Sequence, residues 1–314
     1  MKLPVDVDCQ VRVLRELEPV VAENLNRHLS VARDWNPHDY VPWSEGRNFG
    51  FLGGDDWEPD QSRLEPAVRA SMVVNLLTED NLPSYHRDIA TTFGRDGAWG
   101  EWVNRWTAEE ARHGAALRDY LVVTRAVDPV DLERRRLRHM SVGTLNEPEG
   151  VLENLAYTAF QELATRLAHR NTGAATGCPI GDQLLARIAA DENLHLIFYR
   201  NTAGAALDIA PDDTLIAIRN AVLNFEMPGA SQPDFHRFSV LIANHGIYDL
   251  RLHHDKVVMP ILRHWKIFER NDLTARGEQV REELADFLGK LDERASRFVE
   301  RRAQRQARAT ALAG

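Results

Sequence analysis

Apolar residues recur along this chain with the spacing of helices rather than the alternation of strands. Prolines, glycines and capping residues mark where each predicted helix begins or ends. We predict an all-α protein whose first helix covers about 10–29 and is followed by a Trp-, Pro- and Gly-rich ordered loop from Trp35 to Gly54. Further helices are predicted from Pro66 to a break at 94–97, from Ala98 to about Ala126, from Pro129 to an interruption at 143–148, from about Glu149 to Arg170, after the loop 171–181 to about Ala206, from Pro211 to 227–229, and over 234–243, 247–263 and 277–306.

No shift in composition and no linker divides the chain, so we predict one domain over residues 1–314. Its parts are an N-terminal helix and loop (1–64), a four-helix core (65–207), C-terminal helices (208–306) and a frayed basic tail (307–314).

Composition narrows the class of protein. With 44% hydrophobic and 27% charged residues, the chain has enough apolar material for a folded core. It lacks an apolar run long enough to cross a bilayer, and residues 1–8 do not resemble a secretory signal, so we expect a cytoplasmic protein without membrane insertion. A net charge of -9 counts against nucleic-acid binding. Two distant cysteines, Cys9 and Cys178, cannot build a Cys-ligated zinc or iron–sulfur site within one chain.

The motif that stands out is Glu-x-x-His, which occurs at Glu110–His113 and again at Glu192–His195. Phosphate-binding glycine loops, the G-x-S-x-G nucleophile motif and His-Glu-x-x-His are all absent. Residues three apart share a helix face, so each motif can direct a carboxylate and an imidazole at one metal ion. A single match arises readily by chance, and a lone Glu or His on a helix is more often a surface or core residue than a ligand.

The spacing of two further acids strengthens the metal hypothesis. Glu79 lies 31 residues before Glu110, and Glu162 lies 30 residues before Glu192, each on its own predicted helix. In antiparallel helix pairs this spacing brings each acid level with the following motif to within about one turn, at 1.5 Å per residue. Four buried carboxylates require cations, and this set of donors is the known signature of ferritin-like di-iron or di-manganese bundles. Mixed oxygen and imidazole donors suit iron or manganese, and of the two we favour iron.

Two neighbouring residues could influence such a site. Pro83 removes the usual intrahelical donor to the Glu79 carbonyl, which predicts a helix kink there, whether functional or merely structural. Thr165 follows Glu162 by three residues and shares its helix face. Its hydroxyl would lie near the metals or would donate to its own helix.

At these residues the sequence resembles the soluble acyl-ACP desaturases, both the plant stearoyl-type enzymes and especially the actinobacterial and mycobacterial ones. Similarity extends from the loop Trp35–Pro42 through Met227–Pro228 to His264–Lys266, which is most of the chain. The matching segments are Thr78–Tyr85 (TEDNLPSY), Trp106–Gly114 (WTAEEARHG), Phe160–Thr165 (FQELAT) and Ala190–His195 (ADENLH).

The resemblance implies a ferritin-like fold, usually a homodimer, with a di-iron centre in each subunit. It makes Glu79 and Glu162 terminal ligands, Glu110 and Glu192 bridging ligands, and His113 and His195 nitrogen ligands. It also matches Thr165 to the family's threonine implicated in oxygen activation. Asp191 and Trp35 match a pair that links an iron-bound His, here His113, toward the surface and carries electrons, or serves only in packing.

Two features depart from the family pattern. Ala111 stands where many members have Asn, but it lies off the Glu110–His113 face, so we expect the metals to survive the change. The segment Gly143–Glu149 is shorter than in many members, which leaves the shape of the substrate channel open.

The activity that this resemblance implies is the O2-dependent insertion of a cis double bond into a saturated acyl chain carried on acyl carrier protein (ACP). An apolar tunnel would lie beside Glu162 and Thr165, and an external ferredoxin would supply electrons. The acidic ACP requires a local basic surface, and the densest candidate comprises Arg134, Arg135, Arg136 and Arg138, unless these simply form a solvated face. The alternatives are a di-iron hydroxylase or oxygenase on another hydrophobic substrate, a non-catalytic ferritin-like iron-binding protein, or an inactive desaturase relative.

Overall fold

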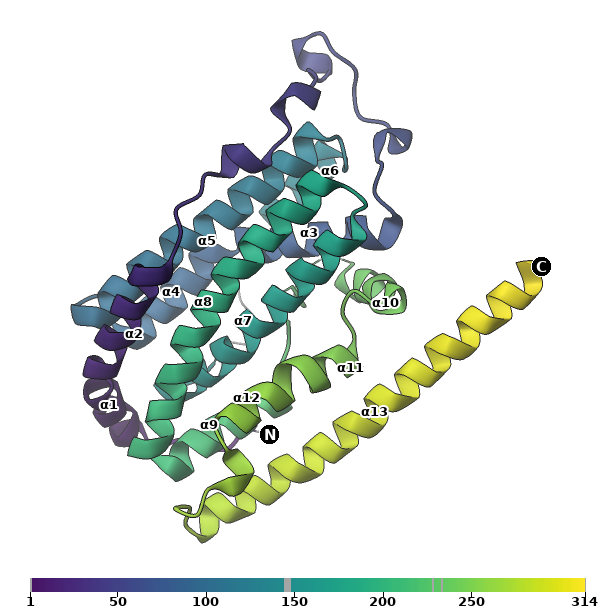
Figure 1. The fold of residues 1–314 in the computed structure, drawn as a ribbon. Coiled ribbons are helices and arrows are strands. Elements are labelled where there is room, and N and C mark those ends of the chain that lie inside the picture. Colours follow the sequence, from purple (N-terminus) through teal and green to yellow (C-terminus); the bar gives the residue numbers. More distant parts are fainter. Residues whose placement is uncertain (1, 144–147, 228, 233, 314) are drawn as a thin grey trace.

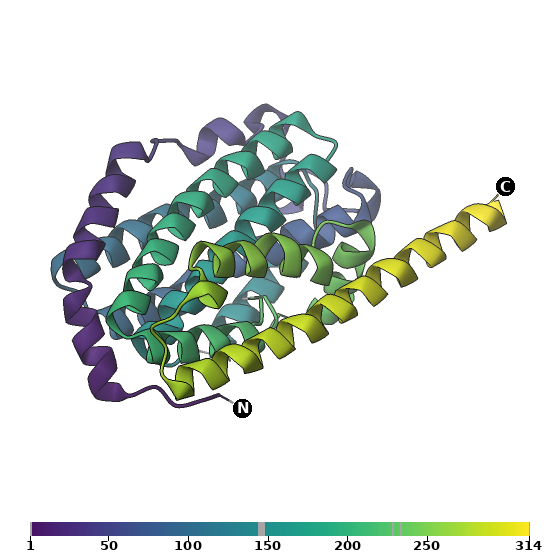
Figure 2. The same ribbon diagram turned by 60° about the horizontal axis from the view of Figure 1, so that its bottom comes forward.

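The computed structural model describes residues 2–143, 148–227, 229–232 and 234–313, and these residues are mostly helical (Figures 1 and 2). The helices are α1 (Val7–Glu16), α2 (Glu18–Val31), α3 (Pro66–Asp80), α4 (Leu82–Phe93), α5 (Gly97–Val123), α6 (Pro129–Val142), α7 (Gly150–Ala175), α8 (Pro179–Ile209), α9 (Pro211–Leu223), α10 (Phe235–His245), α11 (Leu250–Leu252), α12 (Met259–His264) and α13 (Ala275–Ala313). A π-helical segment, His253–Val258, joins α11 to α12. Within the described residues, no helix has both the length and the apolar character needed to cross a bilayer.

The centre of the molecule is a bundle of α3, α5, α7 and α8, in which α7 and α8 lie side by side along most of their length (Figure 1). Buried apolar residues form two clusters, one toward each end of this bundle. On α5, one cluster takes Trp99, Trp102, Val103 and Trp106, and the other takes Ala116, Leu117, Tyr120 and Leu121. The buried polar residues of the Glu-x-x-His motifs lie between them. The core is therefore divided by a polar layer. Burying these charged groups is costly unless they are paired or bind a metal ion.

The remaining helices enclose the bundle. Helices α1 and α2 flank α5, α7 and α8, while α9 and the π-helical segment pack against α7. Helix α13 runs past α9 and α11 and carries the C-terminal end of the chain away from the bundle (Figures 1 and 2). The aromatic-rich loop between α2 and α3 is ordered, as predicted. Buried Arg125 donates hydrogen bonds to the carbonyls of Asn48 (2.8 Å) and Asp55 (2.9 Å), and Trp57 Nε1 donates to the Arg125 carbonyl (2.9 Å).

Two helix breaks lie in the first third of the chain. The helix predicted over 10–29 is divided at Leu17 into α1 and α2, because Pro19 in the first turn of α2 cannot donate a backbone hydrogen bond. The predicted kink near Pro83 is confirmed, since α3 ends at Asp80 and α4 begins at Leu82. Glu79 therefore lies in the last turn of α3.

Other boundaries differ from the prediction. Helix α7 continues to Ala175 rather than ending at Arg170, and α8 already begins at Pro179, so the predicted loop 171–181 is wrong for residues 171–175 and 179–181. Packing explains this extension: the Thr172 and Ser71 hydroxyls lie 2.7 Å apart, and Gly173 allows close approach of Leu185. Helix α9 ends at Leu223, before the predicted stop at 227–229. Helix α13 reaches Ala313, beyond the end predicted near 306. Within the short segment 143–149, residues 144–147 lie outside the described part of the chain.

Candidate metal centre

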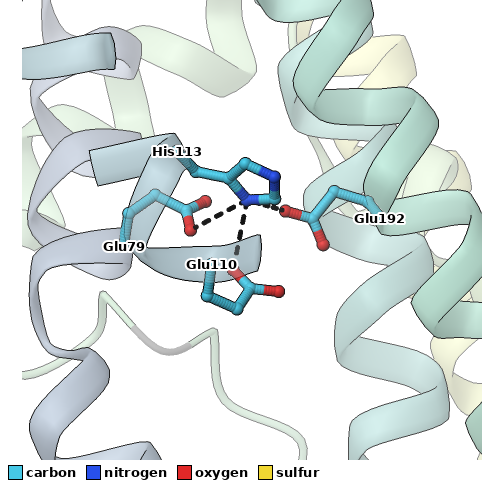
Figure 3. A group of neighbouring side chains, drawn as sticks. All are labelled: Glu79, Glu110, His113 and Glu192. Carbon is cyan, nitrogen blue, oxygen red and sulfur yellow. Dashed lines mark hydrogen bonds and ion pairs between the residues drawn. The ribbon is translucent and has the colours of Figure 1, made fainter. Parts of the chain in front are cut away.

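Each helix of the bundle contributes donors to the polar layer: Glu79 from α3, Glu110 and His113 from α5, Glu162 from α7, and Glu192 and His195 from α8. All of these side chains are buried. They form two overlapping groups, and within each group one donor atom per residue lies within 4.8 Å of the others. The first group is Glu79, Glu110, His113 and Glu192 (Figure 3), and the second is Glu110, Glu162, Glu192 and His195. Only Glu110 and Glu192 belong to both groups, which is the arrangement expected of bridging ligands.

The two imidazoles are oriented alike. His113 Nδ1 faces the carboxylates of Glu79 (3.6 Å), Glu110 (3.2 Å) and Glu192 (3.4 Å) (Figure 3). His195 Nδ1 likewise lies 2.8 Å from Glu110 and 3.7 Å from Glu162. Both Nε2 atoms point out of the cluster. This orientation leaves each Nδ1 directed at the space between the carboxylates, as a metal-binding imidazole requires.

Outside the cluster, each Nε2 atom meets an acid from the opposite helix. His113 Nε2 lies 3.4 Å from Asp191, which also accepts a hydrogen bond from Trp35 Nε1 (2.7 Å). His195 Nε2 lies 3.0 Å from Glu109, which is also 2.9 Å from His28 Nε2. Such outer carboxylates fix the tautomer and orientation of metal-binding imidazoles.

Glu109, His28 and His169 are site residues that sequence reasoning missed. His169 Nε2 lies 2.9 Å from Glu79 Oε1, and this hydrogen bond orients the Glu79 carboxylate. A signal for Glu109 was present, because an acid directly precedes the Glu of both motifs, as Glu109 and as Asp191. Nothing in the sequence marked the two histidines, which reach the site only through helix packing.

Three predicted neighbours are also placed. The Thr165 hydroxyl lies 3.2 Å from Glu192 Oε2 and 3.1 Å from the Gln161 carbonyl, so it can donate either to the cluster or to its own helix. Both interpretations of Thr165 therefore have a structural basis. Trp35 is buried beside the His113 ring, with centroids 6.2 Å apart. Ala111 is exposed, off the Glu110–His113 face as expected.

Burial and neighbouring charges both shift the pKa values of these groups. Burial raises the pKa of Glu162 well above its usual range. Burial alone would lower the pKa of His113, but the charge of Glu110 and a hydrogen bond to Asp191 raise it well above its usual range. The surrounding carboxylates have the same effect on the pKa of His195. The protein alone must therefore retain protons to balance the buried negative charge, a role that bound cations can take over.

The donor set fits a pair of iron or manganese ions. Glu162 Oε2 is fully buried and has no hydrogen-bond partner among the described residues, and Glu162 belongs to the second group. Four carboxylates and two imidazoles are the hard and intermediate donors that these metals prefer, whereas structural zinc sites favour thiolates. The two free cysteines, Cys9 and Cys178, are not part of either group.

A cavity of about 550 Å³ opens beside α7, at the end of the molecule where α7 begins. Its wall includes Tyr157 of α7, which precedes Glu162 by five residues, Leu223 at the end of α9, and Phe225 and Met227 after that helix. It is lined by both apolar and polar side chains, including Lys2 and Glu153 at 2.6 Å from each other.

A helical bundle whose polar layer holds two overlapping carboxylate–imidazole groups defines the class of ferritin-like dinuclear metalloproteins. Residues 9–313 match the fatty acid desaturase family, and the protein belongs to this family.

Several members of the family are similar over most of the chain. DesA1 of Mycobacterium tuberculosis, provisionally named an acyl-[acyl-carrier-protein] desaturase, is 53% identical over 95% of this chain and 91% of its own length. A palmitoyl-[acyl-carrier-protein] 4-desaturase from chloroplasts of Ophrys sphegodes is 31% identical over 90% of this chain and 80% of its own. The crystal structure of M. tuberculosis DesA2, also provisionally named, matches with a TM-score of 0.69 at 35% identity, covering 81% of this chain and 95% of the other. The predicted family and the ferritin-like helical fold are thus confirmed.

Proposed function

We propose that this protein is an acyl-[acyl-carrier-protein] desaturase that holds two iron ions and uses O2 to introduce a cis double bond into a saturated acyl chain. The observation that carries the proposal is the pair of overlapping donor groups that share Glu110 and Glu192. Identity of 53% to DesA1 supports the same activity, because it extends over nearly the whole chain rather than the motifs alone.

In this proposal Glu79 and His113 would hold one iron and Glu162 and His195 the other, with Glu110 and Glu192 available to both because they belong to both donor groups. The bound irons supply the oxidising power needed to remove hydrogen from an unactivated methylene, which no amino-acid side chain can provide. The chain itself orients these donors. Trp106 Nε1 donates to Glu162 Oε1 (3.0 Å), and Asp191 and Glu109 keep the two Nδ1 atoms free to bind metal. Thr165 places a hydroxyl 3.2 Å from Glu192 Oε2, where it can donate a proton to that carboxylate.

The acyl chain is proposed to enter through the cavity beside α7. Tyr157 on its wall is separated from Glu162 by five residues, or about 7.5 Å along the helix axis. The chain would then extend past Glu162 and Thr165 among the apolar residues of the bundle. Because the whole cluster is buried, a methylene bound beside it would be shielded from water.

Electrons are proposed to come from an external ferredoxin through Trp35, Asp191 and His113. A surface cavity of about 450 Å³ lies over this route, because its lining residue Arg187 forms an ion pair with Asp191. Three further arginines line the same cavity: Arg33, Arg166 and Arg170. A basic surface next to Asp191 suits an acidic redox protein. The homodimer remains a prediction from the family resemblance, and the cytoplasmic location remains a prediction from the sequence.

The direct test is mass spectrometry of acyl chains after iron-loaded protein is incubated with saturated acyl-ACPs of several lengths, O2, ferredoxin, its reductase and NADPH. We expect a loss of two hydrogens that requires both iron and O2. The Glu110→Ala and His195→Ala variants should bind less iron and give no product. A gain of one oxygen would indicate a hydroxylase instead. Unchanged acyl chains at two irons per protein would favour a non-catalytic iron-binding protein.

A further inference from the structure

Helix α6 presents an unusual outer face. Val130, Leu137 and Val142 on this helix are 56%, 57% and 51% exposed. Arg134 and Arg138 are exposed between them at helical spacing. The opposite face is buried through Leu132 and His139. The exposed face therefore combines large apolar side chains with positive charge, which is typical of protein contact surfaces rather than of ordinary solvated helices.

The four arginines of α6 divide into two pairs. Arg135 binds Asp131 and Asp234, and Arg136 binds Asp80 (2.8 Å) and Glu133 (3.0 Å), so this pair fixes α6 to the body of the protein. Arg134 and Arg138 form no ion pair with any residue that the structure describes. Of the four arginines predicted as a basic surface, only Arg134 and Arg138 therefore remain available to a partner.

Helix α6 also ends next to the cavity proposed for the acyl chain. His139 Nδ1 lies 3.4 Å from Ser231 Oγ, and Ser231 lines that cavity. The Arg135–Asp234 ion pair fastens α6 to the same segment (3.0 Å). A partner that covers the outer face of α6 would thus be beside the cavity mouth.

We propose that Val130, Arg134, Leu137, Arg138 and Val142 form the surface that binds acyl carrier protein while its acyl chain enters the cavity. This inference rests on the proposed function and identifies where the carrier docks. The protein has a net charge of -9 and ACP is acidic, so the two repel each other except where basic side chains are concentrated. The apolar residues between the arginines supply the contact area that charge alone does not.

The test is the double variant Arg134→Glu/Arg138→Glu. Both substitutions are at exposed helical positions, and Glu has nearly the same helix propensity as Arg. The matched control is Arg301→Glu/Arg305→Glu on α13, which changes the net charge equally and lies on a helix that projects from the bundle (Figures 1 and 2). With saturating ferredoxin, KM for acyl-ACP should rise about tenfold in the α6 variant, kcat should stay within about twofold, and iron content should not change. A direct binding measurement with acyl-ACP should show the same loss of affinity and a weaker dependence on salt.

Three results would overturn the docking surface. The first is an unchanged KM in an α6 variant whose wild-type parent is active. The second is an equal rise in KM in the α13 control, which would indicate a general effect of net charge. The third is a change in the oligomeric state of the α6 variant, measured by sedimentation velocity, which would identify the outer face of α6 as a contact between copies of the chain. If the wild-type protein neither binds nor desaturates any acyl-ACP, the proposed function itself fails.

Discussion

Among single side chains, membership of one or both donor groups decides how much metal a substitution should remove. Glu192 belongs to both groups and Glu79 to one. We expect Glu192→Ala to lose both irons and Glu79→Ala to retain about one per chain, measured by elemental analysis after reconstitution. Desaturation should be lost in both variants. Equal iron contents in the two variants would contradict the division into ligands of one donor group and ligands of both.

The outer acid Glu109 should control affinity rather than the number of metal ions. It holds His195 Nε2 at 3.0 Å, but it is not a member of either donor group. Glu109→Gln should weaken iron binding by about 10- to 100-fold, as for other carboxylates that orient metal-bound histidines. Competition with a chelator would measure this change. Glu101→Gln, an exposed change on the same helix, should leave affinity unaltered.

Sequence could predict which six side chains gather in the polar layer, because Glu110 and His113 share a helix face and the 31- and 30-residue spacings add Glu79 and Glu162. Glu109 was harder to assign, since it faces away from Glu110 and contacts His195 from another helix. His28 and His169 have no local partner at all. Their roles arise from the packing of α2 and α7, which no sequence spacing encodes.

Among the helical elements, the π-helical segment contains a histidine that should make stability depend on pH. His253 packs on Phe225, with ring centroids 4.7 Å apart, and lies 2.9 Å from the Tyr248 hydroxyl. Burial, with a contribution from His254, lowers the pKa of His253 to about 4. The folded protein therefore binds fewer protons here than the unfolded chain, whose His titrates near 6.5.

It follows that the contribution of His253 is retained above pH 6.5 and lost as the pH falls toward 4, by about 3 kcal/mol in total. Denaturant unfolding of the wild type and of His253→Gln at pH 7.5 and pH 5 measures this loss. The wild type should lose more stability than the variant over this interval. Parallel losses in the two proteins would show that His253 is not the responsible group.

Local signals predicted helix ends where proline or a capping residue decides them. Pro83 marked the break between α3 and α4, and Asp128 caps α6 by accepting a hydrogen bond from the Val130 amide (2.8 Å). The extension of α7 past Arg170 was not predictable in this way. It depends on Thr172 and Gly173 meeting α3 and α8, so tertiary contacts outweighed the weak helix propensities of Thr and Gly.

For the whole molecule, the polar layer between two apolar clusters should make folding stability depend on metal. A ligand that binds only the folded state stabilises it by about 4 kcal/mol when present at about 1,000 times its Kd. We expect chelator-treated protein to unfold at a clearly lower temperature than the iron-loaded form in calorimetry. Glu192→Ala should show little of this difference. An identical Tm with and without iron in the wild type would contradict a buried metal site.

The arrangement of rings around the cluster also gives the protein a built-in optical signal. Trp106 hydrogen-bonds Glu162 (3.0 Å), Trp35 hydrogen-bonds Asp191 (2.7 Å), and the Trp102 ring centroid lies 6.0 Å from that of His195. Three of the seven tryptophans in the chain thus adjoin the candidate ligands or their partners. Intrinsic fluorescence should therefore fall as iron fills the site, so that loading can be followed in real time without a label.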